Sequence, residues 1–167
     1  MSTIWKRDYT LKEINQFSKE SIVENIGIEF IEKGDDYIRA SMPVDNRTKQ
    51  PLGILHGGAS VVLAETLGSM ASYMTLDDNK YSVGLEINAN HLKSAANGHV
   101  IGKVKPVHLG KTTQIWDISI KNDQDHLICV SRLTMVVLEL LKTGQDSESE
   151  LSLSRLHRTL SYSDKQK

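Results

Sequence analysis

The sequence predicts an α+β fold in which a curved, mainly antiparallel sheet wraps around one long central helix. Three observations support this prediction. Alternating apolar patterns typical of strands occur twice before residues 57–74 and four times after them. Residues 57–74 are almost all apolar or small, and about 18 residues of helix would extend ~27 Å. Finally, no repeat of roughly 20–50 residues is visible, so we expect one core and no solenoid.

The segments before the long helix are short. Residues 11–17 carry apolar side chains at helical spacing after Thr10, a candidate N-cap, so one or two short helices are expected. Residues 26–44 alternate about a Gly-Asp-Asp turn, which predicts a hairpin. Residues 45–55 are polar and contain proline and glycine. They predict a loop that leads into the helix at Gly57.

Extended segments follow the long helix. The stretches "YSVGLEINANHL", "GHVIGKVKPVHL" and "TTQIWDISIKNDQDHLICVSRLTMVVLEL" each alternate, and a turn at residues 121–125 divides the last into two strands. We therefore expect one domain over residues 1–141. Residues 142–167 are polar and serine-rich, which predicts a disordered tail. Leucines at helical spacing in this tail leave a short docking helix as the alternative.

The composition excludes several classes of function. The 167 residues include 20 basic and 21 acidic side chains, so no electrostatic footprint for nucleic acid is expected. No apolar run approaches the ~20 residues that span a bilayer, and the N-terminus lacks an apolar signal-peptide segment. These features predict a cytoplasmic protein that does not associate with a membrane. Cys129 is the only cysteine, and the six histidines lack ligand spacing. Neither a disulfide framework nor a metal site is expected.

Glu65 is the one charged residue within the apolar segment 57–74. An ionised carboxylate in apolar surroundings is costly unless it finds donors or faces a polar cavity. A structural carboxylate paired with a lysine, an arginine or backbone groups is the simpler interpretation. Ser69, four residues on, lies on the same helical face and could hold a water or a ligand oxygen beside the carboxylate. That neighbour favours a functional role.

Gly57 begins the predicted helix. Its N–H group lacks an intrahelical partner, the helix dipole favours negative charge there, and the missing side chain lets a ligand approach. These properties suit an oxyanion site. Eight residues of helix nevertheless separate Gly57 from Glu65 by ~12 Å, too far to act on one carbonyl. Two helices packed antiparallel across a two-fold axis would bring Gly57 of one chain to Glu65 of the other.

The stretch "GDDYIRASMPVDNRTKQPLGILHGGASVVLAETLGSMAS" resembles the hotdog-fold acyl-CoA thioesterases, in the branch of 4-hydroxybenzoyl-CoA thioesterase and 1,4-dihydroxy-2-naphthoyl-CoA hydrolase. The resemblance covers residues 4–141 and includes "INANHLKS" and "PVHLGK". A bare His-Gly-Gly is a weak signal. Gln50, the run from His56 to Gly58, Glu65 and Ser69 in this register are specific together.

The resemblance implies an acyl-CoA thioesterase whose active site is shared between two chains. Gln50 and the Gly57 N–H of one subunit would polarise the thioester carbonyl, while His56 fixes the loop and assists the leaving sulfur. Glu65 of the other subunit would be the catalytic carboxylate, as a nucleophile or as a general base, and Ser69 would position water. An aryl acyl group is favoured, and no cofactor is needed because coenzyme A belongs to the substrate.

The resemblance also implies a set of substrate contacts and an assembly. The expected contacts, besides Ser69, are Gly58, Met70, His91, Lys93, His108 and Lys111. Ordinary packing for the histidines and solvated lysines are the alternatives. Related sequences often carry His-His-Arg where this chain has His91-Leu92-Lys93, which changes the contacts expected there. A homodimer that pairs into a dimer of dimers is the expected assembly.

Two other functions remain open from the sequence. A hotdog dehydratase or hydratase would also use a histidine and a carboxylate on an acyl thioester. The Gly-Gly after His56 argues against it, because those enzymes carry a His-Phe-Pro pattern. A non-catalytic acyl-CoA-binding or regulatory protein is the third class. The absence of a DNA-binding segment in the sequence argues against a transcriptional sensor.

Overall fold

A computed structural model describes residues 3–140 of the chain. Two short helices precede a hairpin, a long helix follows, and four strands complete the fold. The elements are α1 (Leu11–Phe17), α2 (Ile22–Asn25), β1 (Glu29–Lys33), β2 (Ile38–Pro43), α3 (Gly57–Met74), β3 (Lys80–His91), β4 (His99–Leu109), β5 (Thr113–Asn122) and β6 (Leu127–Glu139). This is the order predicted from the sequence. The predicted tail at residues 142–167 lies outside the described residues.

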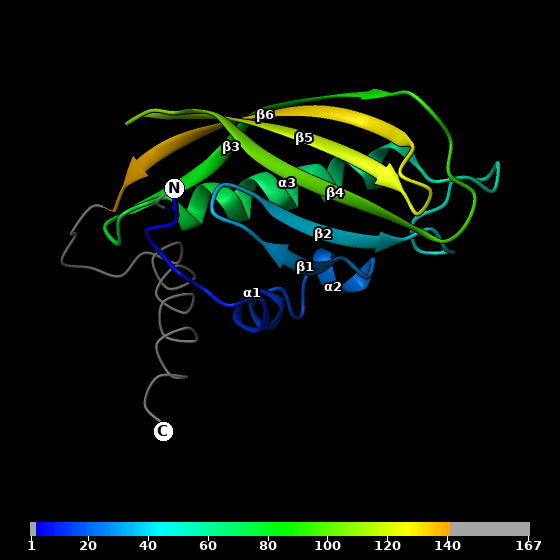
Figure 1. Ribbon diagram of the computed structural model, residues 1–167, viewed down its shortest axis with the longest axis horizontal. Helices are drawn as coiled ribbons and strands as arrows, with labels where there is room; N and C mark the ends of the chain where they lie inside the picture. The colour runs from blue at the N-terminus through cyan, green and yellow to red at the C-terminus, as the bar shows by residue number, and fades with distance from the viewer. Residues whose placement is uncertain (1–2, 141–167) are drawn as a thin grey trace.

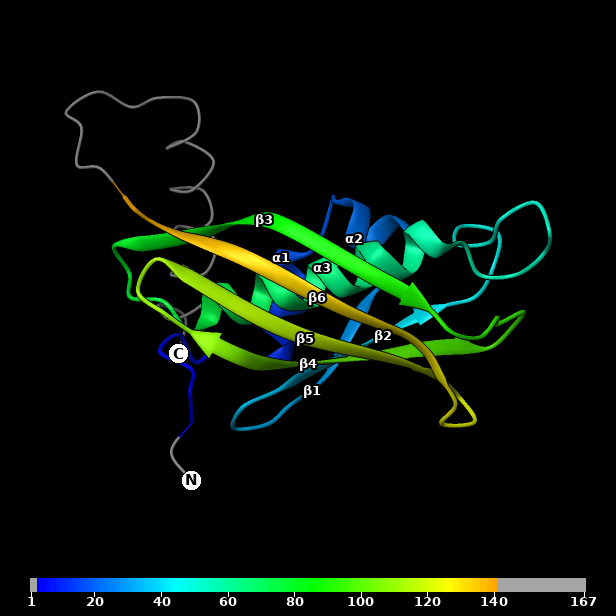
Figure 2. The same cartoon turned by 90° about the horizontal axis from the view of Figure 1, so that it is seen from above.

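The strands form one curved sheet around α3 (Figures 1 and 2). The strand order is β1-β2-β4-β5-β6-β3, and every pairing is antiparallel. Strand β3 follows α3 in sequence but lies at the sheet edge, where β6 is its only partner among the described strands. The α+β prediction is therefore confirmed.

Side chains fix where the first helix begins. Thr10 accepts a hydrogen bond from the Glu13 N–H, and the Glu13 carboxylate accepts one from the Thr10 N–H at 2.8 Å. This capping box satisfies two N–H groups that the first helical turn leaves without partners. Thr10 is therefore the cap that the sequence predicted.

The core lies between α3 and the inner face of the sheet. Leu63 and Leu67 of α3 are fully buried against the strands. Two glycines permit the close approach, because a Cβ at Gly68 would lie 2.4 Å from Leu133 Cδ2 and a Cβ at Gly102 would lie 2.4 Å from Leu67 Cδ1. A side chain at either glycine would require these buried leucines to shift within the packed core.

Strand β3 contains a bulge that changes which residues face the helix. Gly84 pairs with Met135 and Glu86 pairs with the adjacent residue, Thr134, so Leu85 is the extra residue. Before the bulge, Ser82 is on the helix side, where its hydroxyl lies 2.7 Å from that of Ser72 in α3. After it, odd-numbered residues such as Ile87 pack against the core. A one-residue insertion exchanges the two faces of a strand, as observed here.

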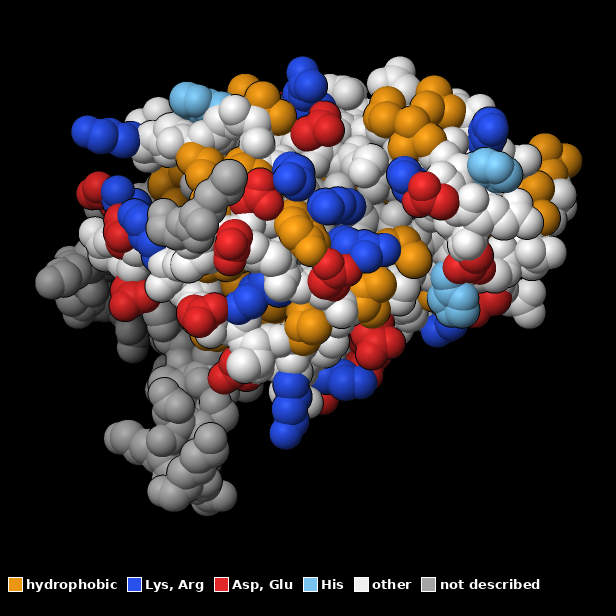
Figure 3. Space-filling model, in the orientation of Figure 1, with side chains coloured by type: hydrophobic (Ala, Val, Ile, Leu, Met, Phe, Trp, Pro, Cys, Tyr) orange, Lys and Arg blue, Asp and Glu red, His pale blue; other side chains and the backbone are white. Residues whose placement is uncertain are grey.

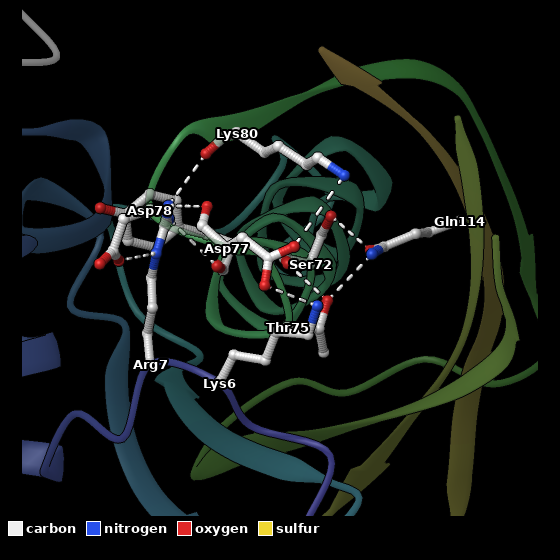
Figure 4. A network of polar contacts seen from close by, with 9 residues as sticks. Lys6, Arg7, Ser72, Thr75, Asp77, Asp78, Lys80 and Gln114 are labelled. Atoms are coloured by element: carbon white, nitrogen blue, oxygen red, sulfur yellow. Dashed lines mark hydrogen bonds and ion pairs between the residues drawn. The ribbon is translucent and has the colours of Figure 1, made fainter. Parts of the chain in front are cut away.

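The segment before α1 is tied to the far end of α3. The Arg7 side chain is 5% exposed, and its guanidinium lies 4.0 Å from the centre of the Tyr73 ring. It donates hydrogen bonds to three backbone carbonyls, those of Tyr73, Asp77 and Lys80 (Figure 4). Arg7 thereby joins the N-terminal segment, the α3–β3 turn and the start of β3.

Charges of both signs are interspersed on the face of the molecule shown in Figure 3. Among residues 3–140, no helix has the length and apolar character needed to cross a lipid bilayer. Across the same residues, no group of three or more His, Cys, Asp or Glu side chains is placed to hold a metal ion. Cys129 is buried, and this burial raises the pKa of its thiol.

Candidate active site

Glu65 lies on an exposed face of α3, next to the edge strand β3. Its side chain is exposed, and no hydrogen bond or ion pair to it is formed within residues 3–140. A structural carboxylate would have a lysine, arginine or backbone partner, so that alternative lacks support within the described chain. The free carboxylate is available for a ligand or for a second chain.

A cavity of about 830 Å³ opens beside Glu65. Ser69 and Met70, two of the predicted contacts, line the same cavity, since positions 65 and 69 lie one turn apart on α3. The remaining walls are mostly apolar and come from α1, α2, β1, α3 and β3. They include Phe17, Ile22, Val23, Phe30, Val62 and Tyr73. The cavity is suited to an apolar group carried next to a carboxylate.

Gln50 lies in a compact loop before α3. Its N–H donates to the Ile54 carbonyl, and its own carbonyl accepts from the Gly53 N–H, both at 2.9 Å. Gly53 has a φ of 78°, a left-handed conformation that favours glycine. The His56 N–H donates to the Thr48 carbonyl at 2.8 Å and closes the loop. These bonds hold the Gln50 backbone at a fixed place beside the start of α3.

His56 is the N-cap of α3. Its Nδ1 accepts a hydrogen bond from the Gly58 N–H at 2.8 Å, so in the neutral ring Nε2 carries the proton. This bond fixes the ring and satisfies one N–H of the first turn. Gly57 lies between these residues, and a Cβ there would be only 2.8 Å from His91 Nε2. The His91 ring thus lies close to the helix start, and a side chain at position 57 would displace it.

A second cavity of about 340 Å³ is lined by several of the other predicted site residues. Gln50, Gly57, His91 and Lys93 line it together, as predicted contacts from the loop, the helix start and the end of β3. Glu65 does not reach this cavity, and Gln50 does not reach the larger one. The predicted residues of a single chain are thus divided between two cavities, here called half-sites, which are separated along α3 by about 12 Å.

Two predicted contacts lie elsewhere. His108 is near the end of β4 and Lys111 is in the turn before β5, and neither lines a half-site. Lys111 instead lines a separate cavity with Lys6 and Lys80, and His108 packs against Gly110. Their contact with coenzyme A stays a prediction. Gly58 is next to the His56 ring, where its N–H serves the cap.

Sequence reasoning missed two features of the site. The residues from Phe17 to Val23 form a wall of the larger cavity, although the sequence only indicates that they are part of short helices. Gly84 was also missed, and an ideal Cβ there would lie 3.1 Å from Glu65 Oε1. An isolated glycine within a strand pattern indicates a bulge or a close approach, so this signal was present in the sequence.

Comparison with known proteins agrees with this geometry. The chain belongs to the thioesterase superfamily, whose family model matches residues 52–129, and it has the hotdog fold of that family. The 1,4-dihydroxy-2-naphthoyl-CoA hydrolase of Escherichia coli K12 is 51% identical over 135 residues, which cover 81% of this chain and 99% of that protein. The proofreading thioesterase EntH of Cronobacter turicensis is 50% identical over 81% of this chain and 98% of its own length.

Solved structures extend the comparison to three dimensions. The crystal structure of thioesterase HI1161 from Haemophilus influenzae superposes with a TM-score of 0.83 at 47% identity, covering 86% of this chain and all of that one. The predictions of a hotdog fold and of a thioesterase are therefore confirmed at the level of the family.

Proposed function

We propose that this protein hydrolyses an aryl acyl-CoA thioester to the free acid and coenzyme A, at a site completed by two copies of the chain. The observation that carries the proposal is the division of the predicted residues between two cavities. Glu65 and Ser69 line one, while Gln50 and Gly57 line the other. Each half lacks part of the predicted machinery: the larger cavity lacks Gln50 and the Gly57 N–H to polarise the carbonyl, and the smaller one has no carboxylate.

A two-fold axis between antiparallel copies of α3 joins the halves. In such a contact Gly57 of one chain approaches Glu65 of the other, and the same contact is repeated on the other side of the axis. Two equivalent sites result. The exposed position of Glu65 in a single chain agrees with this arrangement, because the face that carries it is the face that the partner would cover.

The outer edge of the sheet at β3 is a further argument for pairing with a second copy of the chain. Strand β3 has 12 residues, and its outer edge has no partner among the described strands. Val83 and Leu85 along this edge are 45% and 66% exposed. A long edge strand with exposed apolar residues is a template for pairing with another strand. An antiparallel β3–β3 contact would cover the edge and place the two α3 helices side by side.

The chemistry follows from the groups in the two halves. The Gln50 side chain and the Gly57 N–H would polarise the thioester carbonyl, aided by the positive end of the α3 dipole. Glu65 then either removes a proton from the attacking water or attacks the carbonyl carbon itself. In the first route water replaces the thiolate of coenzyme A as the C–S bond breaks. In the second, the C–S bond breaks to release the thiolate and form a mixed anhydride with Glu65, and water then hydrolyses the anhydride to the free acid and the Glu65 carboxylate. The covered interface would strengthen these electrostatic contacts.

The length and apolar lining of the larger cavity favour an aryl acyl group as the substrate. Its apolar walls extend along α3 from Glu65 towards Tyr73, a distance of about 12 Å by helical rise, which is enough for a bicyclic ring. A relative at 51% identity is named for a dihydroxynaphthoyl-CoA substrate. Lys93 and His91, at the smaller cavity, would then face the coenzyme A side of the thioester.

The test measures release of free thiol with a thiol-reactive dye from benzoyl-, hydroxynaphthoyl- and medium-chain acyl-CoA. Wild type is compared with Glu65→Gln, and Glu29→Gln serves as a control because Glu29 is exposed on β1 at the opposite edge of the sheet. We expect Glu65→Gln to lose more than roughly a hundredfold in kcat/KM, ~2.7 kcal/mol of transition-state stabilisation, while the control is unchanged. The buried Cys129 thiol adds little dye signal.

Two results would overturn the proposal. Equal turnover by wild type and Glu65→Gln would remove Glu65 from the chemistry. Tight binding of acyl-CoA without any thiol release by the folded wild type would favour the non-catalytic acyl-CoA-binding protein. The same samples, assayed for dehydration of a 3-hydroxyacyl thioester, would test the dehydratase.

A further inference from the structure

Gly84 of β3 lies directly against the Glu65 carboxylate. An ideal Cβ at position 84 would be 3.1 Å from Glu65 Oε1, and no other atom of the described chain, beyond its own neighbours in sequence, lies within 4 Å of that point. The space that the missing side chain leaves is therefore next to the carboxylate alone. This differs from Gly68 and Gly102, whose missing side chains accommodate core leucines.

The backbone does not require a glycine at position 84. Within the described residues, positive φ values occur at Gly27, Gly53 and Gly98, and at two non-glycine residues, but not at Gly84. Alanine can adopt the conformation found there, and glycine in a strand interior weakens the strand. Fold stability would favour a side chain at position 84, so the glycine calls for another explanation.

The bulge at Leu85 directs position 84 towards Glu65. Ser82 and Gly84 face α3 before the bulge, and Ile87 faces the core after it. Because of the inserted residue, Gly84 can lie under Glu65 while His91, at the end of the same strand, still lies against Gly57. One strand thus contacts both half-sites.

A buried polar network holds this part of β3 at a fixed distance from α3. The Ser72 hydroxyl lies 2.7 Å from the Ser82 hydroxyl and 2.6 Å from Gln114 Oε1. Gln114 in turn donates to Thr75 Oγ1 at 2.9 Å (Figure 4). Ser72, Thr75 and Gln114 are buried and Ser82 is partly buried, so the network resists displacement more than one in open solvent would. The strand cannot easily move outwards to accept a side chain at position 84.

We infer that Gly84 is a positioning residue for the thioesterase reaction: its missing side chain sets where the Glu65 carboxylate lies against β3. The inference rests on the proposed function, in which Glu65 is the catalytic carboxylate. A Cβ at position 84 would lie 3.1 Å from Oε1, so the carboxylate would have to shift by a few tenths of an ångström, which changes its distance from the carbonyl carbon. Displacement of a catalytic group by about 1 Å can lower a rate by roughly a hundredfold, so this smaller shift is expected to cost about tenfold.

The test is a double-mutant cycle of Gly84→Ala and Glu65→Asp, with Asn88→Ala as a control on the exposed side of the same strand. We expect Gly84→Ala to lower kcat by about tenfold or more with little change in KM, and the melting temperature to stay at or above that of wild type. An aspartate at position 65 is one methylene shorter and withdraws from the added Cβ. In the Glu65→Asp background, Gly84→Ala should therefore change kcat by less than about threefold.

The outcomes separate this inference from the proposed function. If Glu65→Gln is inactive but Gly84→Ala keeps kcat within about threefold of wild type, the role of Gly84 is overturned and the proposed function stands. An equal loss in the wild-type and Glu65→Asp backgrounds also overturns it, because that loss acts through the fold or the dimer. The cycle compares the effect of Gly84→Ala on kcat in the two backgrounds, so any loss caused by lower stability in both cancels. If Glu65→Gln is active, the proposed function fails, and the inference fails with it.

Discussion

At the scale of single residues, the two ring nitrogens of His56 have different surroundings. Nδ1 accepts the Gly58 N–H and caps α3. Nε2 makes no hydrogen bond within residues 3–140, and in the proposed reaction it would assist the leaving sulfur. A substitution can therefore remove the second task and keep the first.

We predict that His56→Asn keeps the cap, because asparagine is a favoured N-cap residue, whereas His56→Ala loses about 0.5–2 kcal/mol of unfolding free energy. Urea denaturation at equal protein concentration measures the difference. Both variants should show reduced kcat if Nε2 assists departure of the thiolate. Full activity of a stable His56→Asn variant would limit the histidine to capping.

Single residues also show how far sequence reasoning reaches. Glu65 was identifiable because a lone charge in an apolar helix is costly wherever it lies. Gln50 was identified only through the family resemblance, since an isolated glutamine in a loop carries no physical signal. Gly84 was not identified, because its importance depends on which side of β3 it faces, and the bulge sets that side.

At the scale of elements, the N-terminal segment is held by one buried cation. Arg7 donates to the carbonyls of Tyr73, Asp77 and Lys80, and it lies over the Tyr73 ring. These partners come from the end of α3, the following turn and the start of β3. Tyr73 also lines the larger cavity, so the same contacts support the wall of the proposed acyl site.

We predict that Arg7→Met lowers the unfolding free energy by about 2–4 kcal/mol, because three carbonyls in partly buried hydrogen bonds lose a charged donor and the ring loses its cation. Lys6→Met is the matched control. Lys6 pairs with Asp77 at 2.8 Å, but both side chains are about half exposed, and such a pair contributes less than ~1 kcal/mol. Denaturation curves that coincide for the two variants would contradict the prediction.

Element boundaries were predicted well where local chemistry defines them. The helix starting at Gly57 and the hairpin over residues 26–44 follow from apolar periodicity and turn residues, and both are found. The strand order was not predictable, because β3 pairs with β6 although β4 and β5 lie between them in sequence, and several other pairings would satisfy the same alternation. Gly84 in the strand pattern was a signal of a bulge or a close approach, but only the pairing with β6 shows that Leu85 is the extra residue.

At the scale of the whole molecule, the proposed site has a signature that a single-chain site lacks. Glu65 and Gln50 of any one working site would come from different chains. A dimer containing one Glu65→Ala chain and one Gln50→Ala chain then has one site with both changes and one site with neither. Two inactive proteins would together contain an intact site.

We predict that mixing the two inactive variants in equal amounts, with unfolding and refolding to exchange chains, restores about a quarter of wild-type activity per chain. About half of the dimers are mixed, and each mixed dimer has one intact site. The thiol-release assay reads the recovery, and each variant refolded alone is the control. Activity that stays at the level of the separate variants would place each site within one chain.

The position of β3 also has a consequence during protein synthesis. Strand β3 comes directly after α3 in the chain, yet the only strand it pairs with among the described residues is β6, the last one. On the ribosome, α3 and β3 are therefore synthesised before β4, β5 and β6. Until those strands are made, the apolar surfaces of α3 and β3 are exposed to chaperones. Gly84 cannot meet Glu65 in its final place before β6 arrives, so the candidate site is among the last parts of the protein to form.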